Sequence, residues 1–196
     1  MLPNFLENIS FMAKKILLAV LFLFTTLSAW TADWFAFGGS FGTSAIVNTD
    51  KSIRQYTENF HRIVLEFDIT TEFTLHPAIR LSFGSILLTD FRFKNDNHFN
   101  SLDYNFYTGV RVYPGLAGLR LGVDYNLGRR TDFIQIDSLQ DTRSTRWGNG
   151  FRFLLEYDFR AGKMGLLPII GGGWRHVPRG GSSDHIFSVY FKLLYR

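Results

Sequence analysis

The sequence predicts an all-β protein, an eight-stranded antiparallel up-and-down transmembrane β-barrel. Three observations lead to this prediction. Apolar and polar residues alternate with a period of two in eight segments, which is typical of strands with two different faces. No stretch after residue 30 is apolar and long enough to cross a membrane as a helix. Most of the eight segments have the length of about 9–11 residues that a tilted strand needs to cross a bilayer.

A basic pair followed by an apolar run indicates an export signal near the start of the chain. Lys14 and Lys15 precede the apolar residues 16–24, and small or hydroxylated residues follow. This order is typical of a secretory signal peptide, and the apolar run is too short to span a membrane. We expect residues 1–29 to be the signal peptide and residues 30–196 to form the barrel. Met12 is the expected true start, and cleavage after Ser28 or after Ala29 both fit.

Eight segments separated by turn-forming residues are predicted to be strands. They span residues 34–47, 60–70, 77–93, 102–113, 119–127, 151–160, 166–176 and 185–195. The connections are rich in Asn, Asp, Gly and Pro, which favour turns. We expect short periplasmic turns at 71–76, 114–118 and 161–165, and outer loops at 48–59, 94–101, 128–150 and 177–184. Residues 131–137 alternate again, so the fifth and sixth strands are expected to continue as a hairpin beyond the membrane.

Each predicted strand has one apolar face and one face of small and charged residues. In the sixth strand, the apolar set is Phe151, Phe153, Leu155, Tyr157 and Phe159, and the opposite set includes Arg152, Glu156, Asp158 and Arg160. The seventh strand is the least regular because it contains Gly171-Gly172-Gly173. We interpret these glycines as sites of close backbone packing rather than a phosphate nest, since no helix follows them.

The apolar face is expected to point outward. The interior of an eight-stranded barrel is just wide enough for side chains to fill, and the many large apolar groups would overfill it. Small residues and charges of both signs fit a narrow lumen, where buried charges must be paired. Trp34, Tyr113, Tyr125, Trp174 and Tyr195 lie near strand ends, as interfacial aromatic girdles do. The sheet must also close, because lipid cannot satisfy an unpaired edge.

The charged residues of the predicted inner face form the most informative group. They are Glu66, Asp68, Arg80, Asp103, Arg111, Arg120, Asp124, Arg152, Glu156, Asp158, Arg160 and Lys192. We interpret them as an internal salt-bridge plug in which arginine forks hold carboxylates. The alternative is a narrow polar pore or gate in which the pairs exchange partners. The contacts themselves depend on strand register.

The third outer loop carries basic residues and a tryptophan. These are Arg129, Arg130, Arg143, Arg146 and Trp147. The simplest interpretation is a solvated surface. The functional alternative is a contact surface for anionic lipid headgroups or a host partner, because binding residues concentrate in loops.

The candidate catalytic patterns fit poorly. Gly38-Gly39-Ser40-Phe41-Gly42 matches G-x-S-x-G, but a nucleophile elbow requires a helix after the turn, and here the strand alternation continues. A lipid-modifying enzyme with a rim site is kept as the alternative function. Its nearest residue group is Asp184, His185 and Ser188, with His176 in the preceding strand, although His185 and Ser188 would lie on opposite faces of one strand.

Composition limits the other classes of partner. The chain has no cysteine, which excludes a lipoprotein anchor and a disulfide scaffold. A net charge of +4 without basic runs argues against nucleic acid. The five histidines are scattered without a metal-binding spacing. We therefore expect no catalytic residue, metal or cofactor.

The export signal, eight amphipathic strands, absent cysteine and aromatic-rich last strand resemble the small bacterial outer-membrane barrels of the OmpX, OmpA-transmembrane-domain and OmpW type. The resemblance is architectural and covers residues 30–196. It implies a bacterial outer-membrane location and a structural, adhesive, stress-related or narrow-pore role. It also implies outer-membrane lipids and the barrel-assembly machinery as partners, with host or surface ligands at the loops. Phe187, Phe191 and Tyr195 keep the aromatic periodicity of such barrels, whereas Arg196 departs from their aromatic last residue.

Overall fold

The structure is a computed structural model that describes residues 34–48, 59–115, 118–136, 139–159, 165–180 and 182–196. The expected signal peptide, including Met12, and the charged residue Arg160 lie outside the described residues. The described residues contain no helix, and so none that is long and apolar enough to cross a membrane.

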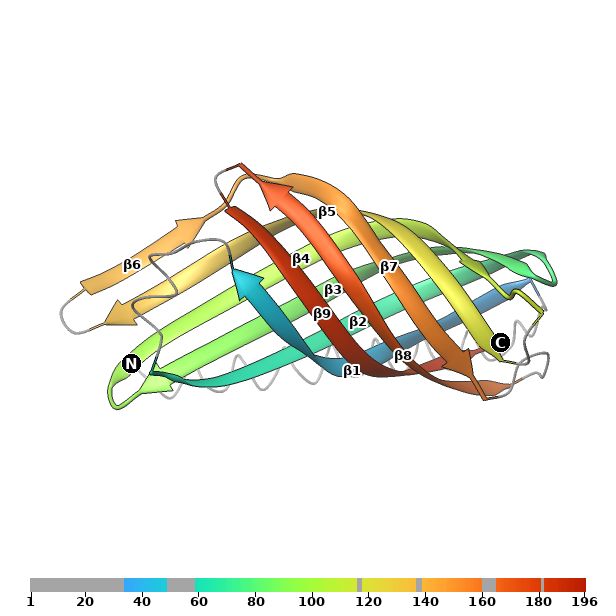
Figure 1. The fold of residues 1–196 in the computed structure, drawn as a ribbon, viewed down its shortest axis with the longest axis horizontal. Coiled ribbons are helices and arrows are strands. Elements are labelled where there is room, and N and C mark those ends of the chain that lie inside the picture. The colour runs from blue at the N-terminus through green and yellow to red at the C-terminus, as the bar shows by residue number, and fades with distance from the viewer. Residues whose placement is uncertain (1–33, 49–58, 116–117, 137–138, 160–164, 181) are drawn as a thin grey trace, which may run out of the picture. The chain divides into compact units, whose positions relative to one another are not determined.

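The chain forms a closed antiparallel barrel (Figure 1). Its strands are β1 (Phe35–Asn48), β2 (His61–His76), β3 (Ile79–Lys94), β4 (Asn97–Val112), β5 (Leu119–Ile136), β6 (Leu139–Ser144), β7 (Gly148–Asp158), β8 (Leu166–Arg179) and β9 (Ser182–Tyr195). Neighbouring strands pair antiparallel, and β1 pairs with β9 to close the sheet. The predicted all-β barrel of eight antiparallel strands is confirmed.

Two segments, β6 and β7, together provide the sixth strand of the barrel. β7 pairs with residues 119–128 of β5, and β6 pairs with residues 131–136 of the same strand. The ladder is interrupted between them, where Thr145 donates its backbone N–H to the Arg130 carbonyl at 2.9 Å. The predicted continuation of the fifth and sixth strands as a hairpin is therefore present in the fold (Figure 1).

Several predicted connections are too long. Residues 71–76 were expected to be a turn but belong to β2, and the following turn contains Pro77 and Ala78. Residues 97–101 belong to β4, so Asn95, with a φ of 54°, and Asp96 make the turn alone. β8 likewise continues to Arg179, and β9 already starts at Ser182. A strand continues while a neighbour offers backbone partners, and this pairing overrides local turn propensity.

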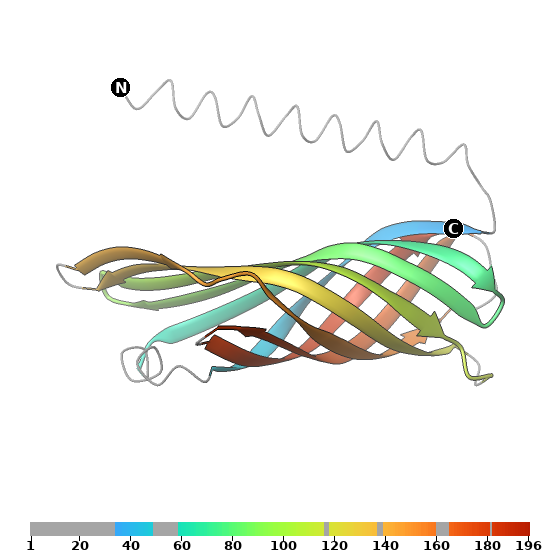
Figure 2. The same ribbon diagram turned by 90° about the horizontal axis from the view of Figure 1, so that it is seen from above.

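The barrel wall has unequal height around its circumference. β2, β3 and β4 each have 16 residues and β5 has 18, whereas β7 has 11 and β8 and β9 have 14 each. The long strands and β6 therefore reach beyond the ends of their shorter neighbours (Figures 1 and 2). We use the name outer extension for β6 together with the outer ends of β2–β5 that reach beyond β7, β8 and β9.

The apolar face of the sheet points outward. Along β7, burial alternates strictly from Gly148 to Asp158. Phe153 and Leu155 are exposed on the outside, while Arg152 and Glu156 are buried on the inside. The barrel is thus apolar outside and charged inside, as the volume argument predicts.

Candidate functional site

The inner face of β9 gives a section through the lumen. From the outer end inward, its buried residues are Asp184, Ile186, Ser188, Tyr190, Lys192 and Leu194. On β2, the buried apolar Val64 is followed by the buried charged residues Glu66, Asp68 and Glu72. The lumen is therefore layered, with two groups of charges separated by an apolar layer.

The deeper group of charges is the core ion-pair cluster. Its members are Asp68, Glu72, Arg80, Arg111, Arg120, Asp124, Arg152, Glu156 and Lys192, all of them buried. Eight of these nine are in the predicted lumen set. Glu72 has the same parity as Glu66 and Asp68. It was missed because residues 71–76 were expected to form a turn.

Arg120 joins two carboxylates in the core ion-pair cluster. Its Nη2 lies 2.5 Å from Glu72 Oε1, and its Nε lies 3.0 Å from Glu156 Oε2. Lys192 Nζ contacts the other oxygen of Glu156 at 2.9 Å. Arg80 adds a longer ion pair of 3.5 Å to Glu72. These contacts link β2, β3, β5, β7 and β9 across the lumen.

Asp124 is the centre of the neighbouring half of the same cluster. It forms ion pairs with Arg111 at 2.5 Å and with Arg152 at 2.7 Å. Arg152 also reaches Asp68 on the far wall at 3.1 Å. A guanidinium shared between two carboxylates satisfies several donors at once, as a buried charge requires.

Tyrosines add hydrogen bonds to these charges. Tyr107 donates its hydroxyl to Asp68 at 2.8 Å, and Tyr190 donates to Glu156 at 2.8 Å. The guanidinium carbon of Arg152 lies 4.4 Å from the centre of the Tyr107 ring. Tyr113, expected to belong to an interfacial girdle, instead donates to Asp158 at 3.0 Å and lies below the guanidinium of Arg120. Sequence position at a strand end could not distinguish these two roles.

Apolar layers lie on both sides of the core ion-pair cluster. Towards the outer end, Val64, Leu88 and Ile186 pack together, with Ile46 against them. At the opposite end, Leu167, Ile169 and Leu194 form a fully buried cluster. Each layer removes water from the charges between them, which strengthens the ion pairs and raises the cost of an unpaired charge.

A second group of charges, the rim ion-pair cluster, lies at the outer end. Its members are Asp90, Arg92, Asp103, Arg130, Asp132, Arg175, Arg179 and Asp184. Arg179 Nη2 contacts both oxygens of Asp103 at 2.8 Å, and Arg130 pairs with Asp132 at 3.0 Å and with Asp184. Only Asp103 of this group was in the predicted lumen set. Parity with Arg80 could have indicated Asp90 and Arg92, and Arg175 lies in the predicted seventh strand, which was the least regular. Arg130, Asp132, Arg179 and Asp184 fall in residues expected to be loops.

Two further members of the predicted lumen set, Glu66 and Asp158, lie outside both clusters. Glu66 is buried and accepts hydrogen bonds from Ser44 and Ser188, both at 2.7 Å. It has no ion-pair partner within the part of the chain that the structure describes. Asp158 is buried at the end of the lumen next to Tyr113.

The predicted loop surface is only partly a surface. Arg143, Arg146 and Trp147 are exposed, and Trp147 packs edge-to-face on Tyr104 with ring centres 5.6 Å apart. Arg129 is half-buried. The expectation for Arg130 is wrong: it lies on the inner face of β5 and is buried in the rim ion-pair cluster.

The ion pair between Arg143 and Asp141, on the hairpin formed by β5 and β6, is exposed to solvent. Arg143 Nε lies 2.7 Å from Asp141 Oδ2, and both residues belong to β6. The hydrogen bond from Arg143 favours the ionised carboxylate, so it lowers the pKa of Asp141 from its ordinary value.

The free space at the rim is small. A cavity of about 10 Å³ is lined by the apolar Leu88 and Ile186 and by the rim carboxylates Asp90, Asp103 and Asp184, among others. That volume holds about one water molecule.

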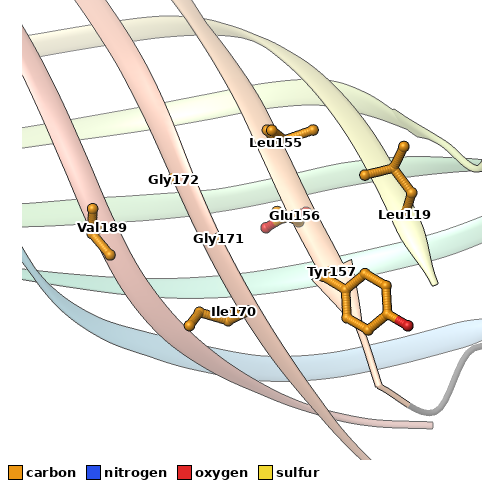
Figure 3. A pocket seen from close by; sticks show the side chains of 8 residues that line it. All are labelled: Leu119, Leu155, Glu156, Tyr157, Ile170, Gly171, Gly172 and Val189. Carbon is orange, nitrogen blue, oxygen red and sulfur yellow. The ribbon is translucent and has the colours of Figure 1, made fainter.

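A shallow apolar hollow lies on the outside of the barrel. It has a volume of about 370 Å³ and an apolar lining that includes Leu155, Tyr157 and Val189. Figure 3 shows these side chains around the bare backbone of Gly171 and Gly172. A Cβ at Gly171 would lie 2.8 Å from Glu156 Cγ and 2.8 Å from the Tyr190 hydroxyl on the inner side. The glycines thus allow the core side chains to approach β8 closely.

The candidate catalytic patterns do not form a site in the described residues. Ser40 lies in the middle of β1, opposite Asp68 on one side and Lys192 on the other, so the nucleophile-elbow pattern is a strand. His185 faces outward, whereas Asp184 and Ser188 are buried inside. No group of three or more metal-ligating side chains suited to an ion occurs among the described residues.

The fold and the lumen together define a class: a small eight-stranded barrel with an apolar exterior and a lumen filled by ion pairs. Solved structures of this architecture are similar. Ail, the attachment invasion locus protein of Yersinia pestis, superposes with a TM-score of 0.59 at 7% identity, over 83% of this chain and 99% of that chain. Neisserial surface protein A gives a TM-score of 0.52 at 7% identity, over 82% and 96%. The predicted resemblance to small outer-membrane barrels is confirmed at the level of the fold.

No protein-family model matches the chain. No curated protein matches it either.

Proposed function

We propose that the protein is an integral protein of the bacterial outer membrane with a closed lumen, which acts at the cell surface through its outer extension as a structural or binding protein. The single observation that supports this most strongly is the inversion of the barrel. Apolar side chains cover its exterior while ion pairs fill its interior.

The exterior supports the membrane location. Phe153 and Leu155 on β7, Ile170 on β8 and Val189 on β9, three consecutive strands, are about half exposed or more. Apolar surface in water costs about 25 cal/mol per Å², and soluble monomers rarely expose a continuous patch beyond a few hundred Å². Lipid removes this cost, and closed barrels with an outward apolar band are typical of bacterial outer membranes. The expected signal peptide at residues 1–29 agrees with export.

The core ion-pair cluster supports a closed lumen. A solute passing through would have to separate pairs such as Arg120–Glu156 and Arg152–Asp124 between two apolar layers. Removing one partner of a buried pair costs about 3–5 kcal/mol, and several pairs would have to open together. The proposal therefore favours the plug over the narrow pore.

The outer extension supports a role in binding. It exposes Arg143, Arg146 and Trp147 beyond the closed part of the barrel. Basic and aromatic side chains together suit anionic surface groups such as lipid phosphates or a sulfated host glycan. Ail, which has the same fold, has been solved in complex with the heparin analogue sucrose octasulfate. Recognition of the last strand by the barrel-assembly machinery belongs to the same proposal.

Two measurements test the proposal. In cell fractionation, the processed protein should stay with outer membranes and leave them only in detergent, and a water-soluble species would overturn the membrane assignment. In planar bilayers, the refolded protein should give no current above background at any voltage, with a porin of known conductance as the positive control. Reproducible current steps would overturn the closed lumen and favour the pore.

A further inference from the structure

Two histidines meet on the outer surface of the hairpin formed by β8 and β9. His176 and His185 are direct cross-strand partners in the register. Their ring centres lie 4.3 Å apart with planes at 15°, and both side chains are partly exposed. Nine positions separate them in sequence, which matches no metal-binding spacing, so only the register brings them together.

The hydrogen bonding of His176 leaves one ring nitrogen available to a ligand. Its Nδ1 lies 3.3 Å from the backbone carbonyl oxygen of Asp184. A carbonyl oxygen can only accept, so in the neutral ring this contact favours the tautomer with the proton on Nδ1 and the lone pair on Nε2. This is the arrangement in which metal-ligating histidines are usually held. The Ser183 hydroxyl, 3.5 Å from Nε2, places an oxygen at the limit of hydrogen-bond distance.

The spacing of the rings suits a shared ion. Nitrogen ligands lie about 2.0–2.1 Å from a late transition metal, so two nitrogens on one ion are separated by at most about 4 Å. The rings are stacked with their planes 15° apart, so both side chains must turn about their Cα–Cβ and Cβ–Cγ bonds before the two lone pairs point at one ion. The direct cross-strand pairing of the two residues, with Cβ atoms about 4.5–5.5 Å apart in such pairs, keeps both nitrogens within reach of that ion. The scaffold is short and fixed, because pairing continues from His176 and His185 to Arg179 and Ser182 at the hairpin end.

We propose that His176 and His185 form a two-imidazole site for a divalent late transition ion, such as Cu²⁺, Ni²⁺ or Zn²⁺, whose remaining positions are taken by water. Imidazole is the protein ligand that these ions favour. With two protein ligands the site is suited to reversible binding rather than to a structural metal. It replaces the sequence-based expectation of no metal, and it does not depend on whether the lumen conducts.

The chain offers a matched control in another pair of outward histidines. His61 and His98 both pair with Phe93, from opposite sides of β3. They are therefore two strands apart, or about 9–10 Å at the usual strand spacing. That separation is too large for one ion to join both rings.

Copper titration of the folded full-length protein in detergent micelles tests the site. Trp174 stacks on His176 at 6.0 Å and on His185 at 5.8 Å between ring centres, so a bound paramagnetic ion should quench its fluorescence. We expect saturable quenching and, by equilibrium dialysis with Cu²⁺, one ion per chain. His176→Ala and His185→Ala should each weaken binding by more than about tenfold, the lower bound for losing even an outer-shell partner. The double variant His61→Ala/His98→Ala should bind as the wild type does.

Folding of each variant is checked by the strand signal in circular dichroism, and His185→Gln provides a second variant of similar volume. His185→Gln is expected to lose binding while keeping the wild-type strand signal. The proposal is overturned if the folded double variant His176→Ala/His185→Ala binds Cu²⁺ with wild-type affinity and stoichiometry. It is equally overturned if only the His61→Ala/His98→Ala variant loses binding.

Discussion

The core and rim ion-pair clusters use the same residue types in different surroundings. In the core, Arg111 and Arg120 have no exposed surface, and apolar layers close both sides. At the rim, Asp90 is held by Arg92 and by Arg62, whose side chain is 33% exposed. The barrel wall is complete around the core, whereas at the rim the shorter strands end.

This difference teaches that the surroundings of an ion pair, and not its geometry alone, decide its contribution. Arg62 and Asp90 meet at 2.8 Å, a distance similar to those in the core. Water can solvate Arg62 if its partner is removed, and no such compensation exists between the apolar layers. We therefore expect the core ion-pair cluster to control the stability of the barrel and the partly exposed Arg62–Asp90 pair to tolerate change.

The largest expected effect comes from breaking the core. Arg120→Met removes the guanidinium shared by Glu72 and Glu156 and leaves two buried carboxylates short of a partner. We expect the free energy of unfolding to fall by about 3–5 kcal/mol, measured by urea titration of the protein folded into phospholipid vesicles. The comparison variant Arg62→Met should lose no more than about 1 kcal/mol, because Asp90 keeps its ion pair with Arg92 at 2.7 Å. Equal losses in the two variants would remove the distinction between the clusters.

A charge on the outer face tests the lipid-facing side of the same comparison. Leu155 is exposed on β7 next to the buried Glu156. Leu155→Arg should destabilise the folded barrel by about 2–4 kcal/mol if this position lies near the bilayer midplane, in the same urea titration. Thr142→Arg on the exposed face of β6 is the control and should have no measurable effect. A neutral Leu155→Arg would argue that this face contacts water.

A smaller effect is expected from crowding the core through the backbone. Gly171→Ala places a methyl group 2.8 Å from Glu156 Cγ and from the Tyr190 hydroxyl. Overpacking of this kind costs about 1–3 kcal/mol. Gly172→Ala points outward and meets only the Ser188 carbonyl oxygen, at 3.2 Å, so it should cost less in the same assay. The reverse order would place the tight packing on the outer face.

The smallest effect is expected at the exposed pair of the hairpin. Arg143→Ala should leave the urea midpoint unchanged, because both partners are solvated. It should raise the pKa of Asp141 towards its ordinary value, since the hydrogen bond that lowers it is lost. The favourable contribution of this bond exists above the ordinary pKa and disappears as the pH falls through the lowered one. Carboxyl NMR of a selectively labelled sample measures the shift, and an unchanged pKa would contradict the contact.

Parity along the strands predicted much of the lumen. Glu66, Arg111, Asp124 and Glu156 were assigned to the inner face by alternation, and the structure buries all four. Arg130, Asp132, Arg179 and Asp184 at the rim were missed because they sit in segments rich in turn formers. Asp184 and Arg179, for example, flank a glycine turn, yet both lie in paired strands. Local composition describes turn propensity, while the length of the neighbouring strand decides where pairing stops.

The sequence by itself determined that each strand has an apolar and a charged face, and that so narrow a barrel must turn the charged face inward. Both conclusions follow from a period-two pattern and from side-chain volume, which are properties of single strands. Only the tertiary structure decided that Arg120 joins Glu72 to Glu156, that Arg130 turns into the rim, and that His176 faces His185. These contacts depend on register between strands, and a shift of one residue would move every side chain to the opposite face.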